Sequence, residues 1–430
     1  MVEGFFNVIS VAAFQALLDE AAPLPAVSLP LEDGLGLTLA RDVMADEDLP
    51  LTDRSSMDGY ALAAADTFGS GETNPGLLDC VGVVDIQTPP SFSLAPGQCA
   101  AIVTGGILPR GADAVLMVEQ TQIVGAAENN VLGTAGDVIE IRRAVAPGEA
   151  VMRQGEDARA GAVLLPAGTL LRPQELGLLA ALGVLEIPVH RRPRVAIIST
   201  GDEVVPVTAR PRPGQVRDVN SLTLAQLCRQ CGADPGFRTH AGDDPAALEA
   251  AVAQALDAQA AGGGHDVVLL SGGSSVGTRD GTLAAIQSCP GAEVLAHGVA
   301  MSPGKPVILA RVGHRTVWGL PGQVASAMVV MLVLVQPFLR RLMGDASSLR
   351  WEQRPGLPAR LTRNVASRQG REEYVRVRLA PGEGGLLATP ELGPSGLLRT
   401  LVASQGLVRI PAGLEGLEAG AMVDVKPFWM

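Results

Sequence analysis

Aromatic residues and positive charge are both scarce in this sequence. Phe, Trp and Tyr make up 3% of the 430 residues, which excludes the rows of stacking side chains that single-strand nucleic-acid binders use. Lys and Arg number 33 against 45 Asp and Glu, so the formal net charge is −12. That balance argues against nucleic acid or an anionic membrane surface as the main partner.

Cysteines are few and show no pairing pattern. The five cysteines are an odd number scattered over a long chain, unlike a disulfide framework. Cys228 and Cys231 have the spacing of a metal-binding pair, but there is no second pair and they fall within a predicted helix. The histidines show no ligand spacing either, so the sequence does not indicate zinc.

Signals for export and for membrane insertion are also missing. The first residues, MVEGFFNVIS, have neither a basic region nor the apolar stretch of a signal peptide. The most apolar run, Val324–Val335, is shorter than the about 20 residues that span a bilayer. We therefore expect this run to form a buried helix, and we expect the protein in the cytoplasm.

The chain is long enough for two to four domains, and the pattern of apolar residues, glycine and proline changes along its length. Ser10 is placed to cap a first helix, and short extended runs separated by Gly and Pro follow. From Pro193, continuous apolar strands alternate with helices, which indicates a doubly wound, mostly parallel α/β sheet. After Leu342, short β runs predict a small barrel or sandwich. The expected elements are strands at 77–87, 98–103, 113–118, 138–142, 194–198, 236–240, 265–270, 307–310, 316–319, 359–363, 374–379, 385–388, 407–410 and 422–426, and helices at 172–182, 221–231, 245–259, 281–287 and 324–339.

Glycine-rich and acidic loops follow four of the central strands, at residues 199–203, 240–244, 271–277 and 319–322. In an open parallel sheet, ligands bind beyond the carboxyl ends of the strands. Glycines ahead of helices let backbone N–H groups approach an anion. Carboxylates beside them offer the oxygen ligands that Mg²⁺ prefers. These carboxylates are Glu203, Asp243, Asp244 and Asp280.

Each loop also has a simpler interpretation. A single glycine loop is as readily a tight strand-to-helix turn, and Asp243-Asp244-Pro245 is typical of a helix N-cap followed by Pro. Neither GxxxxGK[ST] nor a GxGxxG after a strand occurs, which excludes the P-loop class, and no GxSxG supports a serine hydrolase. The clustering of four loops at one expected sheet edge favours a phosphate-binding site.

Three further segments lie in the first third of the chain. SSMDGYA at 55–61 is interpreted either as an Asp-Gly turn or as a loop that presents the Asp58 carboxylate. A predicted strand ends in Thr104-Gly105-Gly106, and Gly155-Glu156-Asp157 supplies another acidic turn.

Together these segments resemble the molybdopterin molybdenumtransferase family, to which the gephyrin E domain also belongs. The matches follow the family order over almost the whole chain and are specific in combination. They are SSMDGYA (55–61), IVTGG to LPRGADAVLMVE (102–119), RQGEDARAGAVLLPAGT (153–169), VAIISTGDEVV (195–205), DVNS (218–221), DDP (243–245), SGGSSVG (271–277), PGKP (303–306) and GLPG (319–322).

The resemblance implies a homodimeric transferase of molybdenum cofactor biosynthesis. It would insert molybdate into adenylylated molybdopterin, with Mg²⁺-assisted release of AMP. Expected partners are a second copy of the chain, a molybdopterin adenylyltransferase and molybdoenzyme maturation proteins, without nucleic acid or membrane. The four domains would be 1–45 with 143–176 (extended linker), 46–142 (inserted, β-rich), 177–344 (central, α/β) and 345–430 (C-terminal, β-barrel).

The resemblance also places site residues. Lys305 would contact an anion, and Arg376 and Ser395 fall on positions linked to oxyanion binding. The catalytic positions are Asp58, Thr104, Asp157, Glu203, Asp280 and Lys305; the cofactor-binding positions are Gly272, Gly273, Ser274, Ser275, Asp243, Pro321, Arg376 and Ser395; the metal ligands are Glu203, Asp243 and Asp280.

The sequence departs from the family pattern at five positions. Ser302 and Gly298 stand where lysines occur, Gln323-Val324 replaces Asn-Pro, and Arg217 replaces Tyr. Each lost charge-assisted contact would weaken anion binding by about 1.5–3 kcal/mol, and Arg217 and Arg279 are candidates to replace the charge. Three interpretations follow: a molybdenum insertase, a divergent paralogue that carries molybdopterin or its nucleotide, and an unrelated α/β enzyme with a phosphate ligand.

Overall fold

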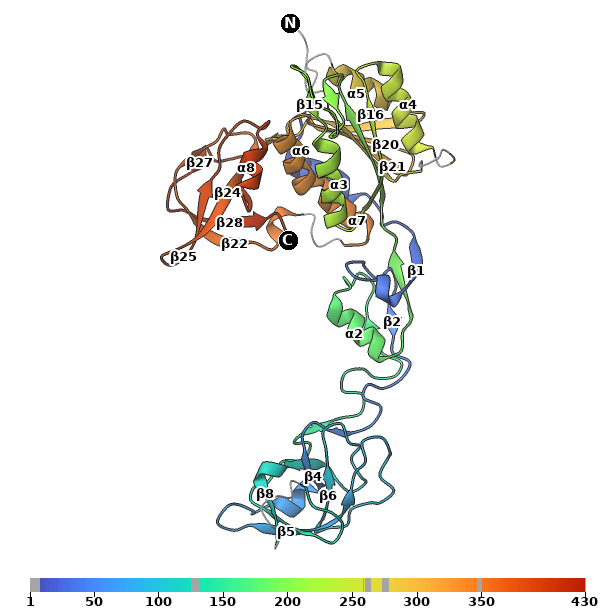
Figure 1. The fold of residues 1–430 in the computed structure, drawn as a ribbon, viewed down its shortest axis with the longest axis vertical. Coiled ribbons are helices and arrows are strands. Elements are labelled where there is room, and N and C mark those ends of the chain that lie inside the picture. Colours follow the sequence, from blue (N-terminus) through green and yellow to red (C-terminus); the bar gives the residue numbers. More distant parts are fainter. Residues whose placement is uncertain are drawn as a thin grey trace. The chain divides into compact units, whose positions relative to one another are not determined.

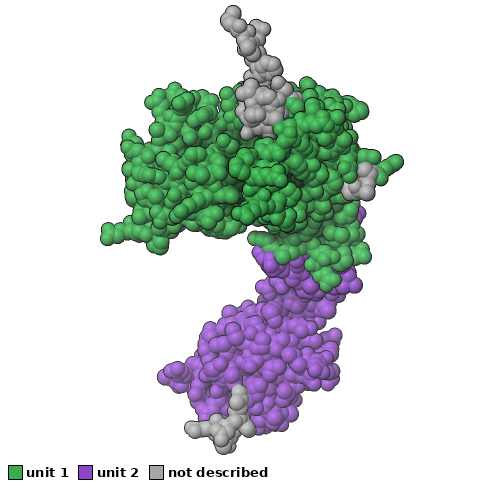
Figure 2. Space-filling model, turned by 45° about the horizontal axis from the view of Figure 1, so that its top comes forward, with its two compact units in different colours: residues 1–40, 168–172, 186–430 green, residues 41–167, 173–185 purple. Residues whose placement is uncertain are grey.

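The computed structural model of the chain describes residues 8–124, 132–257, 259, 264–272, 278–345 and 350–429, with the side chains of 278–280 excepted. The chain forms two compact units, coloured separately in Figure 2. Unit 1 comprises residues 1–40, 168–172 and 186–430, and unit 2 comprises residues 41–167 and 173–185. The four-domain division remains a prediction.

Unit 2 is built around a six-stranded sheet in the order β7-β4-β6-β5-β9-β8. Tyr60, Leu62, Leu116, Ile139 and Ile141 fill its core, each at most 1% exposed. The strands expected at 77–87, 98–103, 113–118 and 138–142 are confirmed. The strands are β4 Gly59–Leu62, β5 Gly76–Val83, β6 Gln98–Ile102, β7 Ala114–Met117, β8 Thr121–Ile123 and β9 Val138–Ile141.

The rest of unit 2 consists of two short antiparallel pairs and one helix. β2 (Val43–Met44) pairs with β11 (Val163–Leu165), and β3 (Arg54–Ser55) pairs with β10 (Val151–Met152). The helix expected at 172–182 is confirmed as α2, Pro173–Ala181.

Unit 1 contains the central six-stranded sheet, in the order β16-β13-β17-β21-β20-β18. The first four strands are parallel, β20 is antiparallel to β21, and β18 is antiparallel to β20, so only β20 runs against the others and the mostly parallel α/β prediction is confirmed. β18 was not expected, because its half-buried edge pattern lacks a continuous apolar run. The strands are β13 Arg194–Thr200, β16 Asp234–Ala241, β17 Val267–Ser271, β18 Ala292–His297, β20 Ile308–Val312 and β21 Arg315–Leu320.

Helices cover both faces of this sheet (Figure 1), and each face has its own apolar core. α1 (Val11–Asp19) begins where the sequence predicted, because Ser10 Oγ accepts the Ala13 N–H at 3.1 Å. α4 (Pro245–Leu256) is capped by Asp244, whose carboxylate accepts the Ala247 N–H. Asp244 therefore has the N-cap role, which local sequence favoured over metal binding. The remaining outer helices are α3 Asn220–Gln230 and α5 Thr278–Gln287.

A continuous helical segment follows β21, as α6 (Val324–Val330), a π-helical turn (Met331–Val335) and α7 (Gln336–Leu342). By length and composition alone the whole segment Val324–Leu342, which extends beyond the apolar run Val324–Val335, could cross a membrane. Most of it is nevertheless buried within the protein core, as a core helix with apolar residues on all sides must be. The predicted buried helix is confirmed.

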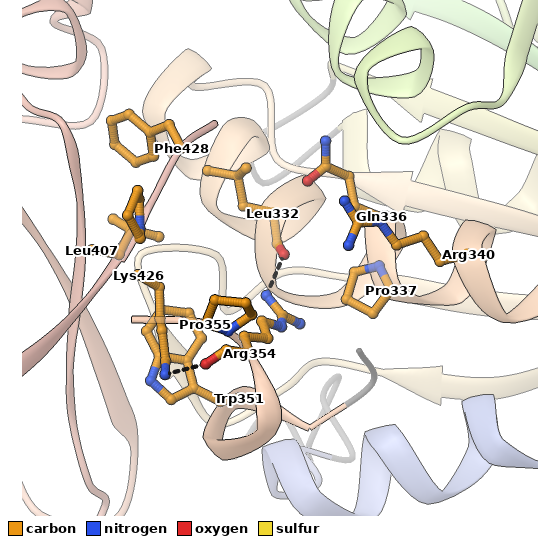
Figure 3. Close-up of a pocket in the computed structure, with 11 residues that line it drawn as sticks. Leu332, Gln336, Pro337, Arg340, Trp351, Arg354, Pro355, Leu407, Lys426 and Phe428 are labelled. Carbon is orange, nitrogen blue, oxygen red and sulfur yellow. Dashed lines mark hydrogen bonds between the residues drawn. The ribbon is translucent and has the colours of Figure 1, made fainter. Parts of the chain in front are cut away.

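Arg354 supports the π-helical turn at Pro337 (Figure 3). Pro337 has no N–H, so the carbonyls of Leu332 and Val333, five and four residues earlier, have no helical donor from it. The Arg354 guanidinium donates to the Leu332 oxygen at 2.7 Å and to the Val333 oxygen at 2.8 Å. Burial lowers the pKa of Arg354 to about 10. The Arg354 side chain thus supplies two hydrogen bonds at a turn where Pro337 removes one backbone donor.

The C-terminal strands form a closed five-stranded barrel, β24-β25-β22-β28-β26, in which β24 also pairs with β26. β19 (Met301–Ser302) adds to β24 from the central part of unit 1. All five strands expected after residue 345 are confirmed, and the barrel is the right one of the two predicted forms. They are β22 Leu357–Leu361, β24 Glu372–Gly382, β25 Gly385–Pro390, β26 Gly406–Ile410 and β28 Met422–Pro427.

Candidate active site

The four parallel strands β16, β13, β17 and β21 end at the same edge of the central sheet. The glycine-rich and acidic loops follow those strand ends, as predicted, with the third loop described as far as Gly272. This is the edge at which open α/β sheets bind their ligands.

A cavity of about 440 Å³ opens at this edge, within the range of roughly 300–1,000 Å³ typical of small-molecule sites. The strand ends, the beginnings of α3 and α6, and a loop of the C-terminal barrel form its walls. Its lining residues are Ser199, Thr200, Glu203, Val204, Pro211, Val216, Arg217, Asp218, Val219, Asn220, Ser271, Gly272, Gly322, Gln323, Val324, Gly396 and Leu398.

Two carboxylates and an unpaired hydroxyl line this cavity. Glu203 lies after β13, and Asp218 lies before α3, where one of its oxygens accepts the Ser221 N–H at 2.9 Å. Ser199 is 2% exposed, and its buried Oγ has no hydrogen-bond partner among the residues that the structure describes. An unsatisfied buried hydroxyl costs about 1–3 kcal/mol, so this atom is suited to pair with a bound ligand.

Close backbone packing fixes the strand ends around these groups. Gly272 has a φ of +146°, and a Cβ there would lie 2.2 Å from the Thr200 oxygen. Asn220 donates from Nδ2 both to Ser271 Oγ at 2.9 Å and to the Gly322 oxygen at 2.8 Å. The first turn of α3 thereby ties the ends of β17 and β21 together.

The magnesium ligands predicted from the sequence do not all meet at the cavity. Asp243 bonds loop to loop instead: its N–H donates to Asp202 Oδ1 at 3.0 Å, and its own carboxylate accepts the Asp202 N–H. The side chain of Asp280 lies outside the described residues. Within the described part of the chain, no three His, Cys, Asp or Glu residues form a group that could hold a metal ion. Glu203 and Asp218, with the free Ser199 oxygen, still fit the oxygen preference of Mg²⁺.

Several other predicted site residues lie away from the cavity lining. Lys305 is exposed, and Pro321 is buried beside Gly322 but does not line the cavity. Gly273, Ser274 and Ser275 lie outside the described residues. Of the predicted unit 1 residues, Glu203 and Gly272 are therefore brought together in the cavity.

Arg376 and Ser395, in the C-terminal region, make structural hydrogen bonds and do not line the cavity. Arg376 is 8% exposed, and its guanidinium donates to Thr400 Oγ1 at 2.7 Å and to the Gly393 oxygen at 2.9 Å. The Ser395 oxygen accepts the Ala325 N–H at 2.9 Å. Arg376 thus holds the barrel loop that supplies Gly396 to the cavity wall, which is a supporting contact and not an open anion site.

Unit 2 carries its own pair of predicted site residues. Thr104 donates to Asp58 Oδ1 from its N–H at 2.6 Å and from its hydroxyl at 2.8 Å. These bonds, the backbone one first, lower the pKa of Asp58. Gly59 is required beside it, because a Cβ there would lie 2.0 Å from the Leu116 oxygen. Asp157 is exposed in a separate turn.

Ser199, Asp218 and Asn220 were not among the predicted site residues. Ser199 and Asp218 lie inside quoted family segments, and Asp218-Val219-Asn220-Ser221 directly precedes a predicted helix. The signal was therefore present in the sequence, but side-chain pairing decided which of these polar groups stay free.

Three of the five departures from the family pattern lie at the cavity. Gln323, Val324 and Arg217 line the cavity, and Arg217 Nε donates to the Ala209 oxygen at 3.0 Å. Gly298 has a φ of +104°, a backbone conformation that disfavours lysine. Ser302 lies in β19 and is half-buried. The Arg279 side chain lies outside the described residues, so compensation by Arg217 and Arg279 remains a hypothesis.

Comparison with known protein families gives three matches that together cover most of the chain. The MoeA N-terminal region (domain I and II) matches residues 9–183, a probable molybdopterin binding domain matches residues 196–341, and the MoeA C-terminal region (domain IV) matches residues 358–428.

Full-length relatives agree with these matches. The chain is 35% identical over 409 residues to molybdopterin molybdenumtransferase 2 of Mycobacterium tuberculosis, covering 93% of this chain and 94% of the relative. It is 32% identical over 397 residues to the molybdopterin molybdenumtransferase of Bacillus subtilis, covering 92% and 88%. The crystal structure of a molybdopterin biosynthesis MoeA protein from Pyrococcus horikoshii matches with a TM-score of 0.75 and 33% identity, over 98% of this chain and 99% of the other. The chain therefore belongs to the molybdopterin molybdenumtransferase family, the transferases of molybdenum cofactor biosynthesis.

Proposed function

We propose that this chain inserts molybdate into adenylylated molybdopterin and releases AMP, with the substrate bound in the cavity at the carboxyl edge of the central sheet. The observation that carries this proposal is the cavity chemistry: Glu203, Asp218 and the unpaired Ser199 hydroxyl lie together at the strand ends. A site that binds only an apolar ligand has no use for two carboxylates at its wall.

The cavity offers carboxylates for a metal ion and backbone N–H groups for a phosphate. Glu203 and Asp218 would hold Mg²⁺, which would offset the charge on the phosphoanhydride as it is cleaved. Phosphate oxygens would be met by backbone N–H groups at Gly272 and at the first turn of α3, where the helix dipole favours an anion. The Ser199 hydroxyl would donate to the substrate and satisfy its own hydrogen-bonding need.

The proposal extends to the assembly and to its surroundings. Asp58, Thr104 and Asp157 would act on the same substrate in a homodimer. The five cysteines are all free and buried, which fits the reducing cytoplasm proposed for this protein. A molybdopterin adenylyltransferase and molybdoenzyme maturation proteins would supply the substrate and receive the product.

The direct test is AMP release from adenylylated molybdopterin with molybdate and Mg²⁺. We expect turnover in the unchanged chain, a loss of at least tenfold in Glu203→Gln and Asp218→Asn, and dependence on the metal. Asp244→Asn is a matched control, because Asp244 caps α4 and does not line the cavity. Loss of activity in the control but not in the two cavity variants would refute the assignment.

A second candidate function is a carrier that binds molybdopterin or its nucleotide without releasing AMP. The absence of lysine at Ser302 and Gly298 favours it, because a dianionic substrate then has fewer cations. Tight, metal-independent nucleotide binding without AMP release, with release gained in Ser302→Lys, would establish the carrier. Release by the unchanged chain would exclude it.

A further inference from the structure

A second cavity, of about 480 Å³, lies in unit 1 away from the candidate active site. Asp266, directly before β17, and Thr316, near the start of β21, both line it. These strands are parallel, so the cavity is at their amino-terminal ends, the edge of the sheet opposite the candidate active site. None of its lining residues belongs to that site.

The interior of this second cavity is apolar. Buried side chains from α1, from the segment after it, from β20 and from α7 form its floor. The floor residues Leu18, Leu24, Leu309, Phe338 and Leu342 are each at most 9% exposed. Hydrogen bonds hold the segment after α1 in place, with Arg341 donating to the Ala21 oxygen and the Leu24 N–H to the Leu342 oxygen. The cavity is therefore a built feature of the fold.

The mouth of the cavity carries more positive than negative groups, although the chain as a whole is acidic. Arg191 is already engaged, since it donates twice to the buried Asp266 carboxylate, at 2.6 and 2.7 Å. Arg311 pairs with Glu293 at 2.6 Å. Arg315 and His314, in the β20–β21 hairpin, make no salt bridge with any residue in the described part of the chain, and both line the cavity.

We propose that this cavity binds an aliphatic monocarboxylate, with its chain on the leucine and phenylalanine floor and its carboxylate at Arg315 and His314. An apolar pocket of this size with a few convergent polar groups is the usual form of a small-molecule site. Arginine prefers carboxylates because its planar fork matches their two oxygens. Glu20 also lines the cavity, and its negative charge selects a monoanion over a dianion such as a phosphate monoester.

Titration calorimetry with octanoate and the full-length chain tests this proposal. We expect saturable binding at one site per chain, and at least tenfold weaker binding of n-octanol, octylamine and octyl phosphate. A free carboxylate and the acyl chain of a phospholipid share the apolar part, so phosphatidylcholine vesicles form a separate arm. We expect no binding to those vesicles.

Three variants locate the site. Arg315→Gln should weaken octanoate binding at least tenfold, and Ala21→Phe should weaken it by filling the cavity. Arg229→Gln is the matched control: Arg229 is exposed on α3 outside this cavity, and its variant should bind octanoate unchanged. Thermal unfolding of each variant reports whether the fold is intact, and octanoate should raise the melting temperature of the unchanged chain and of Arg229→Gln only.

Four results would overturn the proposal. Three of them are no saturable binding of octanoate, equal binding of octanol, and unchanged affinity in a folded Arg315→Gln variant. Binding to vesicles without binding of octanoate would also overturn it, because the site would then recognise a lipid surface. Neither AMP release nor the metal enters these measurements, so they are independent of the proposed function.

Discussion

Replacing Arg354 with methionine tests the account of the π-helical turn. The variant leaves the carbonyls of Leu332 and Val333 without the guanidinium donors that lie 2.7 and 2.8 Å away. An unsatisfied buried carbonyl costs about 1–3 kcal/mol, so two would cost about 2–6 kcal/mol. Removing a buried charge returns part of that sum, as does any water that enters. We expect a net loss of about 3 kcal/mol in the free energy of unfolding.

Pro337→Ala provides the decisive comparison. Alanine restores an N–H at this position, which can donate to the Val333 oxygen within an ordinary α-helical turn. Losing Arg354 should then cost less than in the unchanged chain. We expect the double variant to show a coupling free energy of at least about 1 kcal/mol, which is typical of residues that share a partner.

Tryptophan fluorescence during urea unfolding is the assay. All three tryptophans, Trp318, Trp351 and Trp429, belong to unit 1, and Arg354 lies 5.5 Å from the centre of the Trp351 ring. Arg360→Met is the matched control, since this exposed arginine donates to the Gly420 oxygen and to no other described residue, and its effect should stay within about 0.5 kcal/mol. Equal effects of Arg354→Met in the presence and absence of Pro337 would refute the reasoning.

Three further predictions concern glycines and one titrating group. Gly59→Ala should destabilise unit 2 by more than about 2 kcal/mol, because the added Cβ would lie 2.0 Å from the Leu116 oxygen and the fold does not relax enough to remove such a clash. Limited proteolysis measures the loss of stability. Gly71→Ala is the control and should have no effect, because there is open space around Gly71. Gly272→Ala should abolish AMP release, since the added Cβ would lie 2.2 Å from the Thr200 oxygen. Gly281→Ala is the control and should retain activity, because there is open space around Gly281. A fully active Gly272→Ala variant would show that AMP release does not depend on the close packing of this strand end. Thr104→Val should raise the pKa of Asp58 by removing the hydroxyl bond while keeping the backbone one, as carboxyl ¹³C NMR titration can follow. The pKa of Asp58 is depressed in the folded chain, so its contribution to stability is present above the unfolded pKa and is lost as pH falls through the folded pKa. An unchanged titration midpoint of Asp58 in Thr104→Val would contradict the role of the Thr104 hydroxyl.

The sequence predicted most of the secondary structure because the relevant signals are local. Ser10 and Asp244 cap the helices that follow them, and continuous apolar runs became the parallel strands of the central sheet. β18 escaped prediction because an edge strand needs only one covered face, which leaves no continuous apolar run.

The candidate site was predicted less completely, because the number of free polar groups depends on distant partners. Asp243 and Asp218 look equally available in the sequence. In the structure each carboxylate accepts one backbone N–H, from Asp202 to Asp243 and from Ser221 to Asp218, but of the two only Asp218 lines the cavity. Likewise, the sequence predicts Arg376 as an anion ligand, but its guanidinium donates hydrogen bonds to Thr400 Oγ1 and to the Gly393 oxygen.

The sequence by itself determined the family, the α/β class, the helix starts and the sheet edge where the ligand loops gather. These follow from local capping, from hydrophobic periodicity and from motif order along the chain. Only the tertiary structure decided that the Ser199 hydroxyl in the cavity lining stays unpaired among the described residues, that Arg354 donates to the Leu332 carbonyl near Pro337, and that a second cavity opens at the opposite edge. Each of these depends on which groups from distant segments meet in a buried space, where an unpaired polar atom is costly and every partner counts.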